Sequence, residues 1–394
     1  MKGGALLLEA KKIKRGFALE GGGAKGSYHM GVCKAYIEEG FEFHGVVGTS
    51  IGAINGVMLA SGEFDRALEL WESISIEHLF DQEFLDALKI DSNFPGNITV
   101  ALKKLISDRG VDHSRIKEVL TSYVDEAKVR ESGIDFGLVT YSLSERKPYE
   151  VFLEDIPPGK LIDYILASAN LPFFAPFHVD DNRFIDGGVI NNCPINMLIE
   201  KGYDEIIAIR LKGFGVFRRF DKSANVTIIE TDESLGHFLD FNANNAKLNI
   251  KRGYCDGLRK IHDLKGEYYY LKDVDLGEVA KKLFNIEEAD LDKMKYFKRE
   301  TYEKKRVLFE RIIPDIADHL DLCKNFTYEQ FILAILEFVA LRKNIEQLEV
   351  YNFDLFCKLI KDMPTPKSEN ILNKVFDFSE RKSILIEETV KLII

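Results

Sequence analysis

The sequence predicts an α/β protein with a largely parallel central sheet, followed by a helical region. Strand candidates alternate with helical patterns from residue 15 onward, and this alternation is typical of β-α-β units. Beyond about residue 275, apolar residues recur at helical spacing and only three prolines interrupt them. A length of 394 residues favours two domains over one. We therefore expect an α/β domain with a helical domain after it.

The strand and helix candidates of the first domain follow one another in order. Gly40 is expected to end the first helix in a left-handed conformation. The two strands after residue 130 would suit a hairpin, and the irregular segment 80–111 is either a cap over a site or a surface excursion. Strands are expected at 15–20, 134–143, 149–153, 183–185 and 205–211, with one more ending at 47, and helices at 27–39, 51–59, 63–76, 112–124, 161–169 and 194–201.

Composition excludes several classes of protein. The net charge of −11 gives no electrostatic basis for nucleic-acid binding, and it disfavours strong attraction to anionic membranes, although a local basic patch stays compatible with it. Five scattered cysteines without a C-x-x-C argue against disulfides and zinc. No cluster at metal-ligand spacing appears, so we expect neither metal nor cofactor. The apolar runs are too short for a signal peptide or a bilayer span, which favours the cytoplasm.

The segment Gly48-Thr49-Ser50-Ile51-Gly52 matches G-x-S-x-G and lies between a predicted strand and a predicted helix. A serine on such a turn has strained backbone, and the flanking glycines keep Cβ atoms out of the crowded corner. Its hydroxyl then stands at the carboxyl edge of the sheet, near the positive end of a helix. Ser50 is therefore a candidate nucleophile.

A glycine-rich loop, Gly21 to Gly26, follows the first strand. It fits G-x-G-x-x-G, but a dinucleotide site also needs an acidic residue at the end of the next strand, where Gly48-Thr49-Ser50 lies instead. A P-loop needs Gly-Lys-Ser/Thr, and Lys25-Gly26-Ser27 has the wrong order. Adjacent glycines expose backbone N–H groups at a helix start, as an oxyanion hole requires. A plain tight turn is the alternative.

Two further segments bear on chemistry. Asp186 ends a short strand and is followed by Gly187 and Gly188, which suits close approach to another group or a simple turn. Upstream, a run with three phenylalanines and two prolines, residues 170–177, either fills the core or walls an acyl-binding groove. The sequence leaves both pairs of alternatives open.

Together these motifs resemble the patatin-like phospholipases, serine acyl hydrolases with a Ser-Asp dyad, and specifically their bacterial-type members. Three blocks carry the resemblance in the family's order: G-G-G-x-K-G at 21–26, G-T-S-I-G at 48–52 and D-G-G at 186–188. The segment 167–169, which leads to Phe177, and the segment 232–256 fit as well. The resemblance covers roughly residues 12 to 260, and it stops before the helical region.

The resemblance implies a three-layer α/β/α sandwich with a mainly parallel central sheet over residues 12–265. It also implies a lipid acyl hydrolase of the phospholipase A or lysophospholipase type, acting on fatty-acyl esters through an acyl-enzyme. Ser50 would be the nucleophile and Asp186 the base. Gly48 and Gly52 would shape the nucleophile elbow, Gly187 and Gly188 would follow the base, and the N–H groups of Gly21, Gly22, Gly23, Ala24, Lys25 and Gly26 would form the oxyanion hole.

Two alternatives to the dyad enzyme are open. A Ser-Asp-His triad in chain order would use His237, the one well-placed histidine after Asp186. The chain could also be a non-catalytic lipid-binding or scaffold protein that keeps the fold, although an intact Ser50 and Asp186 argue against this.

Two regions have no assigned chemistry. The helical domain at 275–394 has an unknown role, with helices expected at 299–313, 328–341, 350–361 and 369–375. The loop 212–220 interleaves Phe214, Phe217 and Phe220 with cations, so it either dips into a lipid interface or tucks back onto the core. Peripheral membrane contact is therefore a hypothesis, and the oligomeric state is not predicted.

Overall fold

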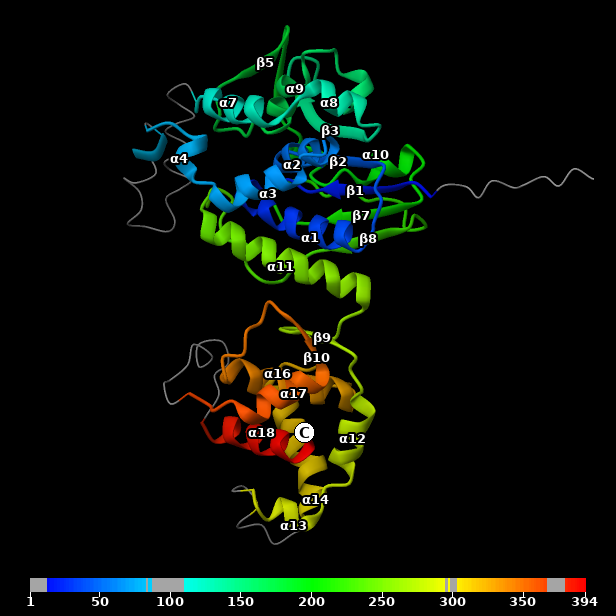
Figure 1. The fold of residues 1–394 in the computed structure, drawn as a ribbon, viewed down its shortest axis with the longest axis vertical. Helices are drawn as coiled ribbons and strands as arrows, with labels where there is room; N and C mark the ends of the chain where they lie inside the picture. The colour runs from blue at the N-terminus through cyan, green and yellow to red at the C-terminus, as the bar shows by residue number, and fades with distance from the viewer. Residues whose placement is uncertain (1–12, 83, 87–109, 295–296, 298–302, 367–379) are drawn as a thin grey trace, which may run out of the picture. The chain divides into compact units, whose positions relative to one another are not determined.

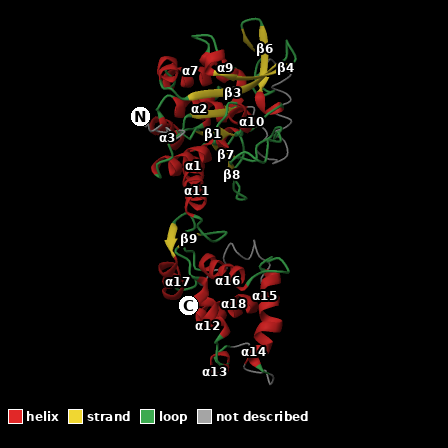
Figure 2. Ribbon diagram, turned by 90° about the vertical axis from the view of Figure 1, so that its right-hand side faces the viewer, coloured by secondary structure: helices red, strands yellow, loops and turns green. Residues whose placement is uncertain are grey.

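The computed structural model describes residues 13–82, 84–86, 110–294, 297, 303–366 and 380–394. The chain divides into two compact units, Met1–Leu258 and Arg259–Ile394 (Figure 1). The long helix α11(Ala243–His262) contains the boundary between them. The first unit holds every strand of the large sheet, and the second is mainly helical (Figure 2).

The first unit is built on an eight-stranded mixed sheet. The strand order is β5-β6-β3-β2-β1-β7-β8, and β4 pairs with β3 outside this path. Four pairings are parallel (β1 with β2, β1 with β7, β2 with β3, β7 with β8), and β6 pairs antiparallel with β3 and β5. The predicted hairpin is confirmed as the antiparallel pair β3 and β4. The strands are β1(Arg15–Leu19), β2(Gly45–Thr49), β3(Asp135–Ser142), β4(Lys147–Phe152), β5(Phe177–Val179), β6(Asn182–Asp186), β7(Glu205–Ile209) and β8(Val226–Ile229).

The helices of this unit follow the predicted order with one correction, and two further helices, at 126–131 and 243–262, were not predicted. The expected helix at 63–76 is two helices, because Ile74 is extended and buried and Ser75 caps a new helix. The helices are α1(Ser27–Glu38), α2(Ile51–Ala60), α3(Phe64–Ser73), α4(Ile76–Leu79), α7(Ser114–Tyr123), α8(Glu126–Glu131), α9(Leu161–Ser168) and α10(Ile195–Glu200), with 3-10 turns η1(Gly23–Gly26), η2(Leu153–Asp155) and η3(Gly187–Val189). Most of the segment 80–111 lies outside the described residues.

Helices cover both faces of the sheet. On one face, residues of α10 pack in one cluster with Ala18 of β1 and Val47 of β2. On the other, Gly56 of α2 lies against Val46 and Leu19. Neighbouring residues of a strand point to opposite faces, so α2 and α10 lie on opposite sides of the sheet. The three-layer α/β/α sandwich with a mainly parallel sheet is confirmed.

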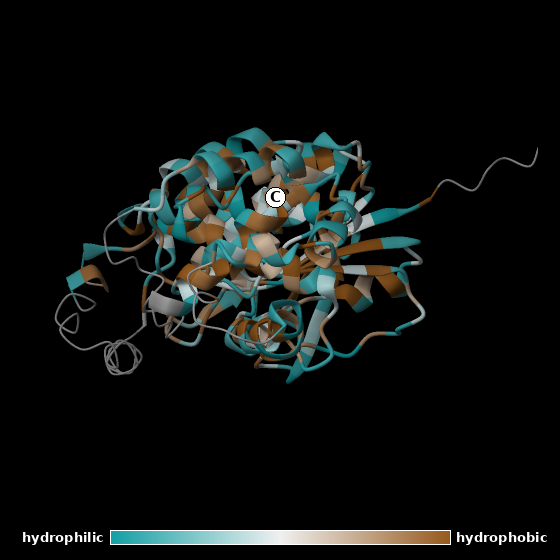
Figure 3. Ribbon diagram, turned by 90° about the horizontal axis from the view of Figure 1, so that it is seen from below, coloured by the Kyte–Doolittle hydropathy of each residue, from teal (hydrophilic) through white to brown (hydrophobic). Residues whose placement is uncertain are grey.

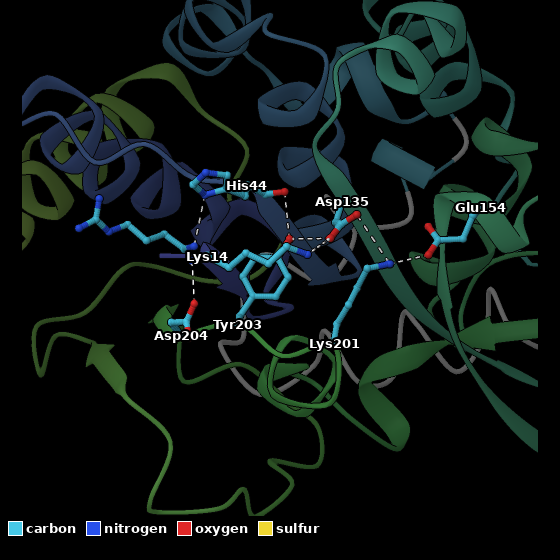
Figure 4. A network of polar contacts seen from close by, with 8 residues as sticks. Lys14, His44, Asp135, Glu154, Lys201, Tyr203 and Asp204 are labelled. Carbon is cyan, nitrogen blue, oxygen red and sulfur yellow. Dashed lines mark hydrogen bonds and ion pairs between the residues drawn. The ribbon is translucent and has the colours of Figure 1, made fainter. Parts of the chain in front are cut away.

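A polar network joins the amino ends of the central strands, opposite the edge where the strands deliver their carboxyl ends (Figure 4). The Tyr203 hydroxyl lies 2.9 Å from the carbonyl of His44 and 2.8 Å from a carboxylate oxygen of Asp135. Lys201 bridges Asp135 and Glu154. These contacts tie the starts of β2 and β3 to the turn before β7. These contacts therefore hold the amino ends of the strands in place. The carboxyl ends of the strands lie at the opposite edge of the sheet.

The second unit is a helical cluster with one small parallel pair of strands. Its core forms around α16, whose buried side chains include Phe331, Ile335 and Phe338. Helices of this unit carry hydrophobic and hydrophilic residues side by side, as amphipathic helices do (Figure 3). Its elements are β9(Tyr270–Lys272), α12(Leu276–Phe284), α13(Glu288–Leu291), α14(Lys304–Val307), the π-helical turn η5(Leu308–Ile312), α15(Ile313–His319), α16(Tyr328–Arg342), β10(Val350–Asn352), α17(Phe353–Asp362) and α18(Glu380–Ile393).

The predictions for this unit fared unevenly. The helix at 328–341 is confirmed as α16. The predicted helix at 350–361 is wrong at its start, because Val350 to Asn352 pair with β9 and the helix begins at Phe353, capped by the Asn352 side chain. The predicted helix at 299–313 begins in undescribed residues and continues past its expected end to His319. The one at 369–375 lies outside the described residues.

Candidate active site

Ser50 occupies a strained turn between β2 and α2. Its φ of 56° lies in the left-handed region, which non-glycine residues rarely adopt. The flanking glycines are sterically required, because a Cβ on Gly48 would lie 2.2 Å from the backbone of Gly52. A Cβ on Gly52 would lie 2.2 Å from the carbonyl oxygen of Leu19. The local sequence thus folds as the G-x-S-x-G pattern indicates, with the serine at the start of a helix.

Strand register brings Asp186 to the same place. β2 pairs with the first part of β3, ending at Thr49 opposite Val139. β6 runs the other way and pairs with the last part of β3, with Asp186 opposite Thr140. The other edge of β3 is occupied by β4, so β2 and β6 follow each other along one edge and their carboxyl ends meet. Ser50 and Asp186 therefore stand at the junction of two strand ends.

The Asp186 carboxyl group is buried and only partly hydrogen-bonded. Oδ1 accepts a hydrogen bond of 2.7 Å from the N–H of Gly188. Oδ2 has no hydrogen-bond partner among the described residues, although the Ser50 hydroxyl is close enough to affect the titration of the group. Burial raises the pKa of Asp186 to about 6, and the Ser50 hydroxyl and the Gly188 N–H counteract part of this. Such a carboxylate is a stronger base than an exposed aspartate.

The glycine-rich loop lies beside the serine. A Cβ on Gly21 would be 3.2 Å from Cβ of Ser50, so the loop backbone passes directly over the elbow. Two of its N–H groups are already used: Gly21 donates to the carbonyl of Asn192 at 2.9 Å and Ala24 to that of Phe238 at 2.8 Å. The N–H groups of Gly21 and Ala24 are therefore not open to a ligand. Gly22 and Gly23 lie between these two residues and line an open pocket next to Ser50.

Two pockets meet at Ser50. An open pocket of about 370 Å³ is lined by the loop residues Gly21 to Gly23, Lys25, Ser50 and Asp186. A narrower cavity of about 100 Å³ is walled almost entirely by apolar side chains of α2, α3, α7 and the segment 169–174. Ser50 and Phe173 line both pockets. The nucleophile candidate thus stands between an open pocket that contains Asp186 and Lys25 and an apolar cavity.

The sequence left open whether the three phenylalanines of the segment 170–177 fill the core or wall a groove. In the structure, two of them line a cavity and one packs elsewhere. Phe173 and Phe174 are buried and line the apolar cavity. Phe177 is half-buried in β5, packs on the small cluster around Phe184, and faces the ring of His113 at 5.1 Å. Two of the three therefore wall the cavity.

Four side chains that support the site were not assigned by sequence. The Ser168 hydroxyl accepts a hydrogen bond from the N–H of Ser50 at 3.0 Å. Ser168 belongs to the segment 167–169, which contributed to the family resemblance but had no role assigned to its serine. Asn192 donates to the carbonyl of Gly21 at 3.1 Å. Glu20 is buried, and its carboxylate accepts the N–H of Lys212 at 2.9 Å. Asn55 donates to the carbonyl of Gly26 at 2.9 Å. For Asn55, the only indication in the sequence was a polar residue five positions after Ser50, within an otherwise apolar helix.

The remaining candidate residue is His237. His237 is exposed, its Nδ1 accepts the N–H of Leu239 at 3.3 Å, and it lines neither pocket. Partial burial and the nearby charge of Lys25 lower the pKa of His237. Among the described residues, no group of three His, Cys, Asp or Glu could hold a metal ion. Within the same residues, no helix combines the length and the apolar character that crossing a membrane requires.

A three-layer α/β sandwich with a serine on a strained strand-to-helix turn, next to a buried carboxylate, defines the class of α/β proteins built around a nucleophile elbow. Comparison with known families makes this more specific. Residues 17–199 match the family described as patatin-like phospholipase. The match contains all three sequence motifs and leaves out the chain beyond residue 199, so a domain of this chain is similar to the family that those motifs predicted.

Several known proteins are similar to this chain over part of its length. An uncharacterized NTE family protein of Mycobacterium bovis is 27% identical over 212 residues, which cover 53% of this chain and 52% of that protein. Lysophospholipase NTE1 of Mycosarcoma maydis is 25% identical over 195 residues, or 49% of this chain and 9% of that protein. The chain spans about half the length of the mycobacterial relative. Among solved structures, VipD from Legionella pneumophila aligns with 98% of this chain and 92% of its own at 14% identity and a TM-score of 0.42.

Proposed function

We propose that the protein is a serine acyl hydrolase that cleaves fatty-acyl esters of lipids, of the phospholipase A or lysophospholipase type. One observation carries this proposal. Ser50, held at φ 56° on its turn, lines both a pocket that contains the buried Asp186 and an apolar cavity. A nucleophile, a base and an apolar space next to the nucleophile are the parts that hydrolysis of a fatty-acyl ester needs.

In the first step Ser50 attacks the ester carbonyl carbon. Its hydroxyl proton passes to the Asp186 carboxylate, and a tetrahedral oxyanion forms. The alcohol then leaves with that proton, and an acyl-enzyme is left on Ser50 Oγ. In the second step Asp186 takes a proton from water, the hydroxide attacks the acyl carbon, and the fatty acid departs while Ser50 regains its proton. A base with a pKa of about 6 suits this exchange near neutral pH.

The developing oxyanion needs donors close to Ser50. The loop over the elbow supplies them, and we assign the N–H groups of Gly22 and Gly23, because both residues line the open pocket and the N–H groups of Gly21 and Ala24 donate elsewhere. Gly23 has a φ of +59°, and a Cβ there would lie 2.2 Å from the carbonyl oxygen of Phe238. Glycine is therefore required for this loop conformation. One such donor contributes roughly 2.7–4 kcal/mol to catalysis.

The two pockets divide the substrate. The fatty-acyl chain enters the apolar cavity, where Phe173, Phe174 and Trp71 contribute to the wall. The alcohol part of the ester occupies the open pocket, where Lys25 is the cationic side chain. The position of Lys25 suits a substrate with a negatively charged group near the ester, as in a phospholipid.

The position of His237 favours the dyad over a triad. A triad histidine must hydrogen-bond both the serine and the aspartate. His237 lines neither pocket, and its ring accepts a hydrogen bond from its own neighbour Leu239. We therefore expect His237→Ala to keep turnover of a soluble ester near the wild-type rate.

Labelling at Ser50 tests the proposal. A fluorophosphonate probe should label Ser50 stoichiometrically, and mass spectrometry of the labelled peptide locates the adduct. Ser50→Ala should abolish both the adduct and the hydrolysis of p-nitrophenyl butyrate. Ser61→Ala is the matched control, since the Ser61 hydroxyl only donates to the carbonyl of Met58 at the end of α2. A properly folded protein that takes no label would be a lipid-binding or scaffold protein.

A further inference from the structure

The loop after β7 carries an exposed apolar tip at the mouth of the open pocket. Phe214 is 89% exposed and lines this pocket, and Val216 two residues on is 47% exposed. Val189 of the turn η3, after Asp186, is 42% exposed. Few large apolar side chains among the described residues are this exposed, and three of them gather here. We call Val189, Phe214 and Val216 the mouth patch.

Backbone contacts hold the mouth patch together. The N–H of Val216 donates to the carbonyl of Gly188 at 2.8 Å, and the N–H of Asn192 donates to the carbonyl of Val216 at 2.7 Å. The loop and the turn after Asp186 are therefore joined edge to edge. Gly213 packs against the glycine-rich loop, where a Cβ would lie 2.1 Å from the carbonyl oxygen of Gly21. The exposed tip is thus braced at its base against both loops of the candidate active site.

The other phenylalanines of this loop turn inward. Phe217 and Phe220 pack on the cluster beneath α10, and the guanidinium of Arg210 lies 4.2 Å from the centre of the Phe217 ring. Of the two outcomes that the sequence left open, Phe217 and Phe220 take the inward one and Phe214 the outward one. A tip with Phe214 alone extended, on a fixed base, is suited to shallow insertion into an apolar medium.

Two of the three cations of the loop 212–220 are paired within the protein, and the third, Arg219, is exposed. Lys212 pairs with Asp232, and Arg218 pairs with Glu150 at 2.8 Å. They have little charge to offer to anionic headgroups, and the net charge of −11 opposes anionic surfaces. The mouth patch thus fits the acyl region of an uncharged or zwitterionic lipid surface better than a strongly anionic one.

We propose that the mouth patch docks the protein on a zwitterionic lipid surface, so that a lipid can pass from that surface into the pocket beside Ser50. The delivery of a lipid to Ser50 rests on the proposed function, because it presumes that Ser50 hydrolyses the lipid. The docking itself requires only the exposed residues, so binding and hydrolysis can be tested apart.

The binding test uses the Ser50→Ala protein and sedimentation with phosphatidylcholine vesicles. Phe214→Ser in this background should lower the partition coefficient roughly tenfold, because most of the benefit of burying a phenyl group is lost. Leu248→Ser is the matched control, since Leu248 is also exposed, at 46%, on α11 and lines neither pocket. Equal binding by the Phe214 variant, or an equal loss in the control, would overturn the proposal.

The nature of the surface forms the second arm. Binding to phosphatidylcholine should change less than twofold between 50 and 500 mM salt, because apolar insertion is not screened. Binding that needs phosphatidylglycerol and disappears in 500 mM salt would mean electrostatic attraction, and it would refute docking by the mouth patch.

Turnover forms the third arm. The double variant Val189→Ser/Val216→Ser changes residues that do not line the pocket. It should lose activity on vesicles several-fold and keep activity on p-nitrophenyl butyrate. Equal losses on both substrates would mean that these residues support the active site and do not dock it. If wild type binds vesicles but takes no fluorophosphonate label, the proposed hydrolase fails and the docking surface stands.

Discussion

Replacing Asp186 with asparagine should make the protein both less active and more stable. Burial raises the pKa of this carboxyl group from its ordinary value of 3.8 to about 6, so the folded state binds its proton more tightly than the unfolded chain does. For a group with this sign, stability falls as pH rises from about 3.8 through about 6. Above pH 6 the full penalty is present, about 3 kcal/mol from the difference in pKa.

The size of the effect depends on pH. The penalty is about 3 kcal/mol at pH 7.5 and about 1 kcal/mol at pH 4.5, because at pH 4.5 the buried carboxyl group is mostly protonated and its charged form is seldom buried. The neutral asparagine avoids it. In a domain of this size 1 kcal/mol moves Tm by roughly 2–4 °C, so Asp186→Asn should raise Tm by about 6–12 °C at pH 7.5. These figures are upper limits, because the new amide needs hydrogen-bond partners of its own.

The assay can report on the first unit alone. Trp71 is the single tryptophan of the chain, is buried, and belongs to α3. Its fluorescence on heating, recorded from pH 4.5 to 8, therefore follows the unit that contains the site. Asp181→Asn, at an exposed position in the turn before β6, is the control for removing a charge. A Tm difference for Asp186→Asn that is negative, or the same at every pH, would refute the reasoning.

Three other predictions follow from the same geometry. The kcat/KM for a soluble ester should fall about tenfold per pH unit below about 6, because the base must be ionised to accept the proton from Ser50; a profile flat down to pH 4.5 would exclude Asp186 as the base. Ser168→Ala should slow fluorophosphonate labelling and lower kcat at unchanged KM, since the N–H of Ser50 loses a buried acceptor worth roughly 1–3 kcal/mol; Ser168→Thr should restore part of the rate. Gly52→Ala should prevent soluble expression, because its Cβ would lie 2.2 Å from the carbonyl oxygen of Leu19, whereas Gly62→Ala has no atom within 4 Å of the added Cβ, costs only the roughly 1–2 kcal/mol of an alanine at a φ of +73°, and should express.

The sequence predicted what depends on local chain geometry. A serine between two glycines at a strand end, and an aspartate at another, are readable because turn chemistry is local. That Ser50 and Asp186 lie close together could not be predicted from these local patterns. Their proximity depends on which part of β3 pairs with β2 and which with β6, and pairing register is a property of the whole sheet. The resemblance to a known family implied the pair, and the strand pairing supplies its physical cause.

Other differences also come from tertiary contacts. Residues 350–352 have helical apolar spacing, yet they extend because β9 offers a strand to pair with. The sequence could not tell which N–H groups of the loop 21–26 were open, because their acceptors, Asn192 and Phe238, are more than 160 residues away in the chain. The split between Phe214 and Phe217 likewise depends on Arg210 and α10, which cover the inner ring.

The junction of β2 and β6 along one edge of β3 makes the proposed activity sensitive to the pairing register of β6. β6 is held to β3 by only three residue pairs, and a slip of one residue would turn every β6 side chain to the opposite face of the sheet. Asp186 would then point away from Ser50, with the hydrophobic layers around the rest of the sheet untouched. A single insertion or deletion in the turn between β5 and β6, which lies outside all three sequence motifs, would therefore abolish the proposed activity without unfolding the protein. A compensating change in the same turn would restore the proposed activity in one step.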